Sequence, residues 1–157
     1  MPAQVTWHGA DLEKLVSADV GRKFQTIALA LAADVKLKLG VPGPTKTNPG
    51  AASSGAGEPP HKRTGHLRRN VSQEAVMEGG EWVARVGTNV KYGYYLEVGT
   101  SGHTIKPGPK GFLAWKTPDG TWAFTRKPVV IPPLKPRPFL RPALDEAGPK
   151  IDRILGR

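Results

Sequence analysis

Histidine is the residue type in this chain best suited to bind a metal or to transfer a proton. His8, His61, His66 and His103 are scattered along the sequence, and no two lie four residues apart. That spacing is the one that puts two metal ligands on the same face of a helix. The chain also has no cysteine, so it offers neither a thiolate ligand nor a disulfide. We therefore expect no metal site and no cofactor.

Two further motifs that could do chemistry are incomplete. Residues 40–46, GVPGPTK, contain Gly and Lys, but not with the spacing of a phosphate-binding loop or with a helix after them. Ser53 and Ser54 do not follow a strand in the pattern of a strand-to-helix elbow, which is what exposes a nucleophilic serine. We expect no catalytic residue in either stretch.

Glu97, in VKYGYYLEVGTS, is the remaining candidate for acid-base chemistry. A general acid or base needs a partner carboxylate, histidine or metal to set its pKa, and no motif pairs Glu97 with Glu81, Asp119 or a histidine. A structural role needs fewer assumptions: the carboxylate could accept backbone N–H groups or pair with an arginine. The arginines considered are Arg68, Arg69 and Arg141. We expect no enzymatic activity; a small hydrolase using Glu97 and a histidine is the alternative.

The first element along the chain is a long amphipathic helix. Between Asp11 and Leu39, apolar residues recur every three or four positions. An unbroken helix of that length would extend about 43 Å, more than a domain of this size fully covers. Part of its apolar stripe would then pack on something else, most simply another subunit. The alternative is a kink at Gly21 that folds the helix back onto its own sheet.

Residues 41–60 predict a flexible loop, because they hold five Pro and four Gly without apolar periodicity. We expect this loop to stay outside the core and to become ordered against neighbouring molecules. After it, Thr64 is predicted to cap a short helix with Leu67 directed inward. Arg68 and Arg69 would then face outward.

Two β-hairpins are predicted, one turning at Gly79-Gly80 and the other at Pro118-Asp119-Gly120. Between them, the spacing of Tyr92, Tyr95 and Leu96 favours a short helix that Gly99 ends. Ser101 to Lys110 would follow as an exposed loop.

The C-terminal part is extended and then helical. Repeated prolines keep residues 129–138 out of a central strand. Pro138 or Pro142 suits a first helical turn, and Gly148-Pro149 interrupts the helix. The sequence predicts one α+β domain over residues 1–157: a long N-terminal helix on a mostly antiparallel sheet built from two hairpins, with short helices between and at the C-terminus.

The net charge of +10 is concentrated in two regions rich in Pro and Gly, within residues 41–70 and 101–135. This charge could simply solubilise the surface, or it could face an acidic partner or nucleic acid. The alternative function is sequence-independent DNA binding, which predicts a steep salt dependence. No run of 18 apolar residues and no basic-then-apolar N-terminus occurs, so we expect neither a membrane span nor a signal peptide.

Three stretches, taken in order, resemble the tail-component family of tailed bacteriophages. They are TGHLRRNV (64–71), VGTNVKYGYYLEVGTS (86–101) and PRPFLRPALDE (136–146). The family pattern is a long helix, then Thr-Gly-x-Leu-Arg, then a Tyr-rich helix ending in Glu-x-Gly-Thr, then Pro-Phe-Leu-x-Pro-Ala. The resemblance covers about residues 11–147, and the 41–60 loop is longer than in a compact member. The matching residues are Thr64, Gly65, Leu67, Arg68, Tyr92, Tyr95, Glu97, Gly99, Thr100, Pro138, Phe139, Leu140, Arg141 and Pro142.

The resemblance implies a structural virion protein, made in the bacterial cytoplasm and assembled into the phage neck. It implies a homo-oligomeric ring, six-fold, which completes or terminates the tail tube and shares the α+β fold of tail terminators. The implied partners are the tail-tube protein and the head connector or stopper protein, with non-specific contact to phage DNA and none to membrane. It also implies that Glu97 fixes a corner of the chain or pairs with a basic residue, within the subunit or across the ring. Phe139 and Leu140 would attach the last helix to the sheet.

Overall fold

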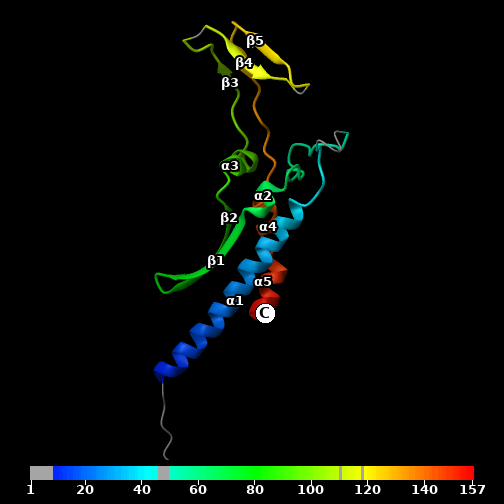
Figure 1. Ribbon diagram of the computed structural model, residues 1–157. Helices are drawn as coiled ribbons and strands as arrows, with labels where there is room; N and C mark the ends of the chain where they lie inside the picture. Colours follow the sequence, from blue (N-terminus) through cyan, green and yellow to red (C-terminus); the bar gives the residue numbers. More distant parts are fainter. Residues whose placement is uncertain (1–8, 46–49, 110, 118) are drawn as a thin grey trace, which may run out of the picture.

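The long helix α1 (Gly9–Lys38) is the element on which the first hairpin and the C-terminal helices pack (Figure 1). The computed structural model describes residues 9–45, 50–109, 111–117 and 119–157. His8, Lys110, Pro118 and residues 46–49 of the predicted loop lie outside the described residues. The remaining elements are α2 (His66–Arg69), β1 (Val71–Glu78), β2 (Glu81–Thr88), α3 (Lys91–Val98), β3 (His103–Ile105), β4 (Leu113–Lys116), β5 (Trp122–Thr125), β6 (Val129–Ile131), α4 (Arg141–Asp145) and α5 (Gly148–Leu155).

Helix α1 is continuous through Gly21, so the predicted alternative of a kink there is wrong. A Cβ added at Gly21 would lie 2.6 Å from the indole ring of Trp82. The glycine therefore allows a strand side chain to pack against the helix and does not break it. One face of α1 is buried through Ile27, Ala28, Leu31, Ala32 and Val35, and Leu39, directly after the helix, is also buried. Val16, Leu29 and Leu37 remain exposed, as expected of a helix that its own domain covers only in part.

Strands β1 and β2 form the first predicted hairpin, in antiparallel register from Val71↔Thr88 to Glu78↔Glu81. Gly79 and Gly80 both have positive φ, 57° and 88°, as a two-residue turn that follows the twist of its strands requires. Ala84 and Val86 pack toward α1 beside Trp82. Trp82, Ala84 and Val86 alternate along β2, so their side chains lie on one face of the strand.

The second hairpin, β4–β5, is also present, but in a separate two-stranded sheet of the described chain. It lies at the end of an arm, residues 101–133, that projects from the rest of the molecule (Figure 1). The arm begins with β3, which pairs with β6 in the register His103↔Ile131, where we had expected only a loop. Three β-branched residues, Val129 to Ile131, precede the prolines, so the prolines end this strand and do not prevent it.

The core lies between α1, the first hairpin and the C-terminal segment. Its main cluster joins Val35 of α1 and Leu39, which directly follows that helix, to Leu67, Val90 and Phe139. A second cluster places Ile27 and Leu31 against Ala147 and α5. The α+β class, with a long helix on antiparallel strands and short helices, is confirmed. Among the described residues, no helix has the length and apolar character needed to cross a membrane.

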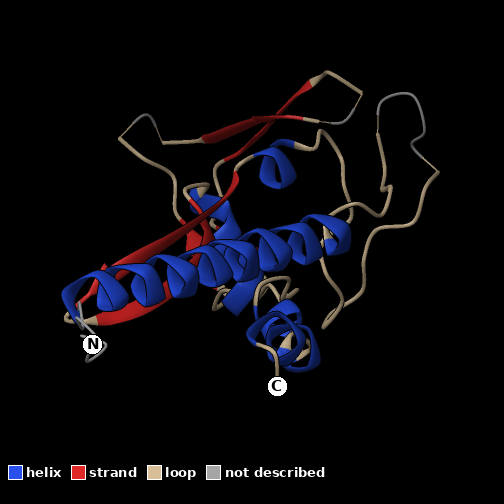
Figure 2. Cartoon of the chain, turned by 90° about the horizontal axis from the view of Figure 1, so that it is seen from below, coloured by secondary structure: helices blue, strands red, loops and turns tan. Residues whose placement is uncertain are grey.

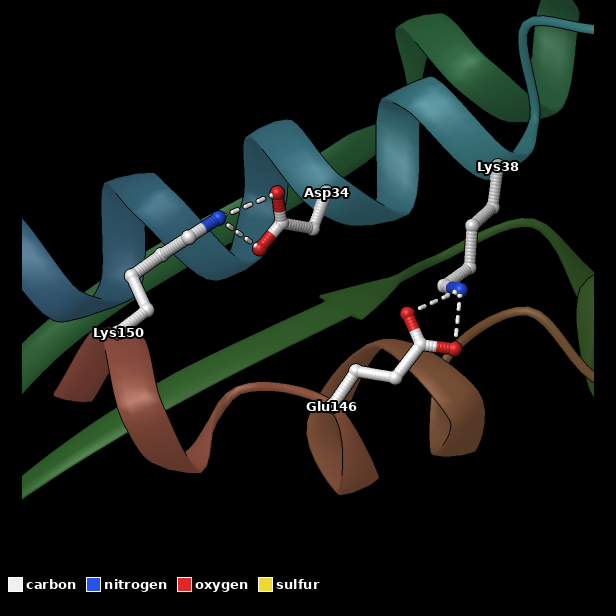
Figure 3. Close-up of polar contacts among 4 residues, drawn as sticks. All are labelled: Asp34, Lys38, Glu146 and Lys150. Carbon is white, nitrogen blue, oxygen red and sulfur yellow. Dashed lines mark hydrogen bonds and ion pairs between the residues drawn. The ribbon is translucent and has the colours of Figure 1, made fainter.

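Two ion pairs fix the C-terminal helices along α1 (Figure 3). Lys38 Nζ lies 2.8 Å and 2.7 Å from the two carboxylate oxygens of Glu146, and Lys150 Nζ lies 2.6 Å from Asp34 Oδ1. Both views of the whole chain show α5 beside α1 (Figures 1 and 2). Pro142 and Pro149 occupy the first turns of α4 and α5, as their fixed φ favours.

Candidate functional site

The three stretches that carry the family resemblance meet at the buried glycine of α3, Gly93. A Cβ added there would lie 2.9 Å from Thr88 Cγ2, 3.2 Å from Leu67 Cδ1 and 3.7 Å from Phe139 Cζ. Leu67 and Phe139 belong to the same buried cluster, and Phe139 is completely inaccessible. We call this meeting point the junction. Leu67 and Phe139 therefore pack in the core and are not exposed to a partner, while Leu140 is half-buried against them.

Glu97 binds the backbone at the start of α4. Its Oε2 accepts hydrogen bonds from the N–H groups of Phe139 (2.8 Å) and Leu140 (3.1 Å), and its Oε1 accepts one from Arg141 (2.9 Å). The first N–H groups of a helix have no partner within the helix, and they carry the positive end of its dipole. The carboxylate therefore acts as a cap supplied by α3. Of the two structural roles predicted for Glu97, this is the backbone one.

The side chains of the three arginines predicted as possible partners of Glu97 contact other groups. Arg68 Nε donates to the carbonyl of Lys36 (2.9 Å), which lies in the last turn of α1. Arg69 donates to the carbonyl of Thr64 (3.0 Å). Arg141 reaches Glu97 only through its backbone, because its side chain lies 3.9 Å from Asp145.

Gly99 ends α3, as the sequence predicted. Its N–H donates to the carbonyl of Tyr95 (2.9 Å), and its φ is 79°. A Cβ there would lie 2.5 Å from the carbonyl oxygen of Leu134, so a side chain would collide with the returning chain. Thr100 and Leu134 then exchange two backbone hydrogen bonds, of 3.0 Å and 3.1 Å. This pair closes the base of the arm.

The start of α2 differs in detail from the prediction. The residue directly before the helix is Gly65, with φ at 74°, and not Thr64. A left-handed backbone favours glycine there, while the Thr64 hydroxyl, one residue earlier, accepts a hydrogen bond from the N–H of His66 (3.3 Å). Leu67 is buried and Arg68 and Arg69 are exposed, as expected.

The tyrosines of α3 face outward. Tyr92, Tyr94 and Tyr95 are exposed in the chain, whereas Gly93 is buried and Leu96 packs against the core. The three-and-four spacing of Tyr92, Tyr95 and Leu96 thus identified a helix, but only Leu96 belongs to its packed face. The tyrosines are left as an aromatic surface above the junction.

A pocket of about 600 Å³ lies beside the junction, and sequence reasoning did not predict it. Leu67, Leu96 and Tyr92 contribute to its wall. Its cations are Lys62, Arg63, Arg68 and Arg137, and no Asp or Glu is among the described residues that line it. The signal available in the sequence was the positive charge of residues 41–70.

Part of the predicted 41–60 loop forms the wall of this pocket. Ser54 and Pro60 are buried, although the loop was expected to stay outside the core. The Gly57 N–H donates to the carbonyl of Pro136 (2.8 Å), and His61 Nδ1 lies 2.8 Å from the carbonyl of Ala52. These hydrogen bonds to backbone carbonyls hold the irregular segment against the domain, and amino-acid composition does not predict them. The Ser54 hydroxyl has no hydrogen-bond partner among the described residues.

The tip of the arm carries an exposed aromatic cluster. The ring centroids of Trp122 and Phe124 are 6.4 Å apart, and those of Phe112 and Phe124 are 5.9 Å apart. Lys116 is the cross-strand partner of Trp122. The sequence predicted the hairpin, but not that its aromatic face would lack a covering layer.

Comparisons of the chain with models of protein families, with curated proteins and with solved structures find no match. Among the described residues, no three His, Cys, Asp or Glu side chains are grouped so that they could hold a metal ion. The assignment of function therefore depends on the junction, the pocket and the exposed surfaces described above.

Proposed function

We propose that this protein is a non-enzymatic structural protein of a tailed-phage virion, which forms a homo-oligomeric ring in the neck. The ring completes or terminates the tail tube and joins it to the head connector. The observation that carries the proposal is the junction: the three stretches that resemble the phage family are far apart in the sequence, yet Leu67, Gly93 and Phe139 lie against one another. Their packing at one site is what a single structural motif built from the three stretches requires.

The chemistry of the junction suits a structural task. The Glu97 carboxylate is occupied by three backbone N–H groups, which fix α3 to the start of α4. Lys38 and Lys150 add ion pairs between α1 and the C-terminal helices. Such a body is rigid enough to present surfaces to neighbours in a fixed orientation, which closed assemblies require.

The exposed apolar surfaces of the chain provide interfaces for assembly. Trp122 and Phe124 on the arm, the tyrosines of α3, and Leu29 and Leu37 on α1 are all exposed in the single chain. Exposed apolar patches on this scale mark interaction sites, and an isolated two-stranded hairpin has little stability of its own. We assign these surfaces to other copies of the chain, to the tail-tube protein and to the head connector.

The experiment is electron microscopy of lysates from a phage with a nonsense codon early in this gene. We expect filled heads beside unjoined tails, or overlong tails if the ring is the terminator. A suppressor host that restores the protein is the control and should restore joined particles. Normal infectious particles without the protein would contradict the proposal.

Sequence-independent DNA binding is the second candidate, favoured by the four cations of the pocket and by the net charge of +10. A protein that neutralises several phosphates binds any duplex and loses affinity steeply as salt rises. A basic surface inside a neck ring could also contact exiting DNA, so the two functions are compatible. Gel-shift titrations of one duplex at several salt concentrations test the candidate, which predicts that affinity falls steeply as salt rises; no binding at low salt would contradict it.

A further inference from the structure

We propose that the basic pocket receives the acidic tip of the β1–β2 hairpin from a second copy of this chain, so that copies join head to tail. The inference rests on the proposed ring and names the contact that builds it. The tip is defined as Glu78, Gly79, Gly80 and Glu81.

The pocket has the properties of a binding site for a negatively charged segment. Lys62, Arg63, Arg68 and Arg137 line it, and none of them forms an ion pair with a described residue. Four uncompensated cations around one concave site repel one another, so an anionic occupant lowers the energy of the site.

A second, independent observation is the Ser54 hydroxyl. This residue lines the pocket and is only 4% exposed, yet its oxygen has no hydrogen-bond partner among the described residues. A buried hydroxyl without a partner is costly, so this wall of the pocket is not fully satisfied in the single chain.

The hairpin tip has the complementary charge and a narrow shape. Glu78 and Glu81 flank two glycines, so no side chain widens the turn itself. Glu78 pairs with Arg85, and this hydrogen bond holds the pKa of its carboxyl below the ordinary value. Glu81 forms no ion pair within the described chain. The tip is therefore negatively charged and has one carboxylate available.

The tip cannot reach the pocket of its own chain. The pocket adjoins α2, which precedes the start of β1, whereas the tip is at the other end of that eight-residue strand. At about 3.3 Å per residue the two are separated by roughly 25 Å. Figure 1 shows the turn of the hairpin directed away from α2.

Charge also argues against two other surfaces of a second copy, the arm and the exposed leucines of α1. The arm carries five Lys or Arg and one Asp. Its net charge is positive, like that of the pocket, so the pocket would repel the arm. The exposed leucines of α1 offer no charge. A contact between two different surfaces of identical chains is heterologous, and it closes into a ring when its rotation permits.

A charge-swap experiment tests the contact. Lys62→Glu reverses one charge of the pocket and Glu81→Lys one charge of the tip, both at exposed positions. Self-association of the full-length chain is measured by sedimentation velocity across protein concentration and salt. We expect each variant alone to associate at least about tenfold more weakly than wild type, because like charges then meet. An equimolar mixture of the two should recover association, since each tip then meets an opposite charge in the other variant's pocket.

Arg153→Glu and Asp152→Lys on α5 are matched controls, because they make the same changes in net charge at exposed positions away from both surfaces. Circular dichroism checks that every variant is folded. The inference is wrong if the wild type stays monomeric throughout, if the swap variants associate like the controls, or if the mixture of impaired variants recovers nothing. It is also wrong if Lys62→Glu weakens duplex DNA binding and leaves self-association unchanged, because the pocket would then bind nucleic acid.

The phage experiment and the association experiment distinguish the ring contact from the neck function. Unjoined heads and tails in the phage experiment, together with unaltered association of the swap variants, would leave the neck function standing and place the ring contact elsewhere. Recovery by the mixture, together with normal particles without the protein, would leave the contact standing and remove the neck function.

Discussion

Glu97 is the residue on which the structural and the catalytic interpretations of this chain depended. Its two oxygens accept three backbone hydrogen bonds from residues 42 to 44 positions later in the sequence. Through these hydrogen bonds the Glu97 carboxylate links α3 to the start of α4. For a structural role of Glu97 the sequence left two partners open, backbone N–H groups or an arginine. It could not choose between them because the donors come from a distant segment.

Replacing Glu97 with Gln tests this role at the residue scale. An amide has one accepting oxygen and no charge, so the three N–H groups lose most of their partner. We expect Glu97→Gln to lower the free energy of unfolding by about 1.5–3 kcal/mol, measured by urea denaturation. Asp152→Asn, at an exposed position of α5, is the control and should change it little. Equal stability of the two variants would contradict the capping role.

At the scale of elements, α1 and β2 pack through a glycine and an indole. Gly21 has no side chain where the ring of Trp82 lies, and that ring also contacts Phe24, with centroids 6.4 Å apart. From the sequence alone, Gly21 was a candidate helix break. In the structure the helix continues through Gly21, and the glycine lets the strand pack close to the helix.

Gly21→Ala should therefore destabilise the protein, although this change usually stabilises a helix interior by about 1 kcal/mol. The new methyl group would lie 2.6 Å from Trp82, and we expect a loss of about 1–3 kcal/mol from overpacking. In a Trp82→Ala background the clash is absent and Gly21→Ala should become stabilising. A double-mutant cycle from denaturation curves measures the coupling, and a stabilising effect in the wild-type background would contradict the contact.

The pairing of β3 with β6 is the element that sequence reasoning missed. Its strands are three residues long and about 25 positions apart, and Gly and Pro surround both. Local periodicity needs longer segments than these. Only the return of the chain, fixed by the Thr100 and Leu134 hydrogen bonds, brings the two strands together.

At the scale of the whole molecule, the chain consists of a packed body and an exposed arm, residues 101–133. Every buried hydrophobic residue among those described lies outside residues 101–133. The arm leaves and re-enters the body between Thr100 and Leu134, which are hydrogen-bonded to each other. The body therefore has no need of the arm to complete its core.

Replacing residues 101–133 with a two-residue Asn-Gly turn should leave the body folded. The Thr100 and Leu134 pair has the hydrogen bonding that such a turn closes, and we expect the free energy of unfolding to change by less than about 1 kcal/mol. Circular dichroism and urea denaturation measure helix content and cooperativity. Loss of a cooperative transition would show that the arm contributes to the fold.

The sequence by itself determined the α+β class, the long helix, both hairpins and the glycine that ends α3. These depend on local patterns: apolar residues at every third or fourth position, alternation of apolar and polar residues along strands, and glycines where the backbone needs a positive φ. Only the tertiary structure decided that the Glu97 carboxylate caps α4, that Gly21 receives Trp82, and that four cations surround one pocket. Each of these depends on residues far apart in the sequence, whose distances are fixed by packing of the whole chain and not by any local preference.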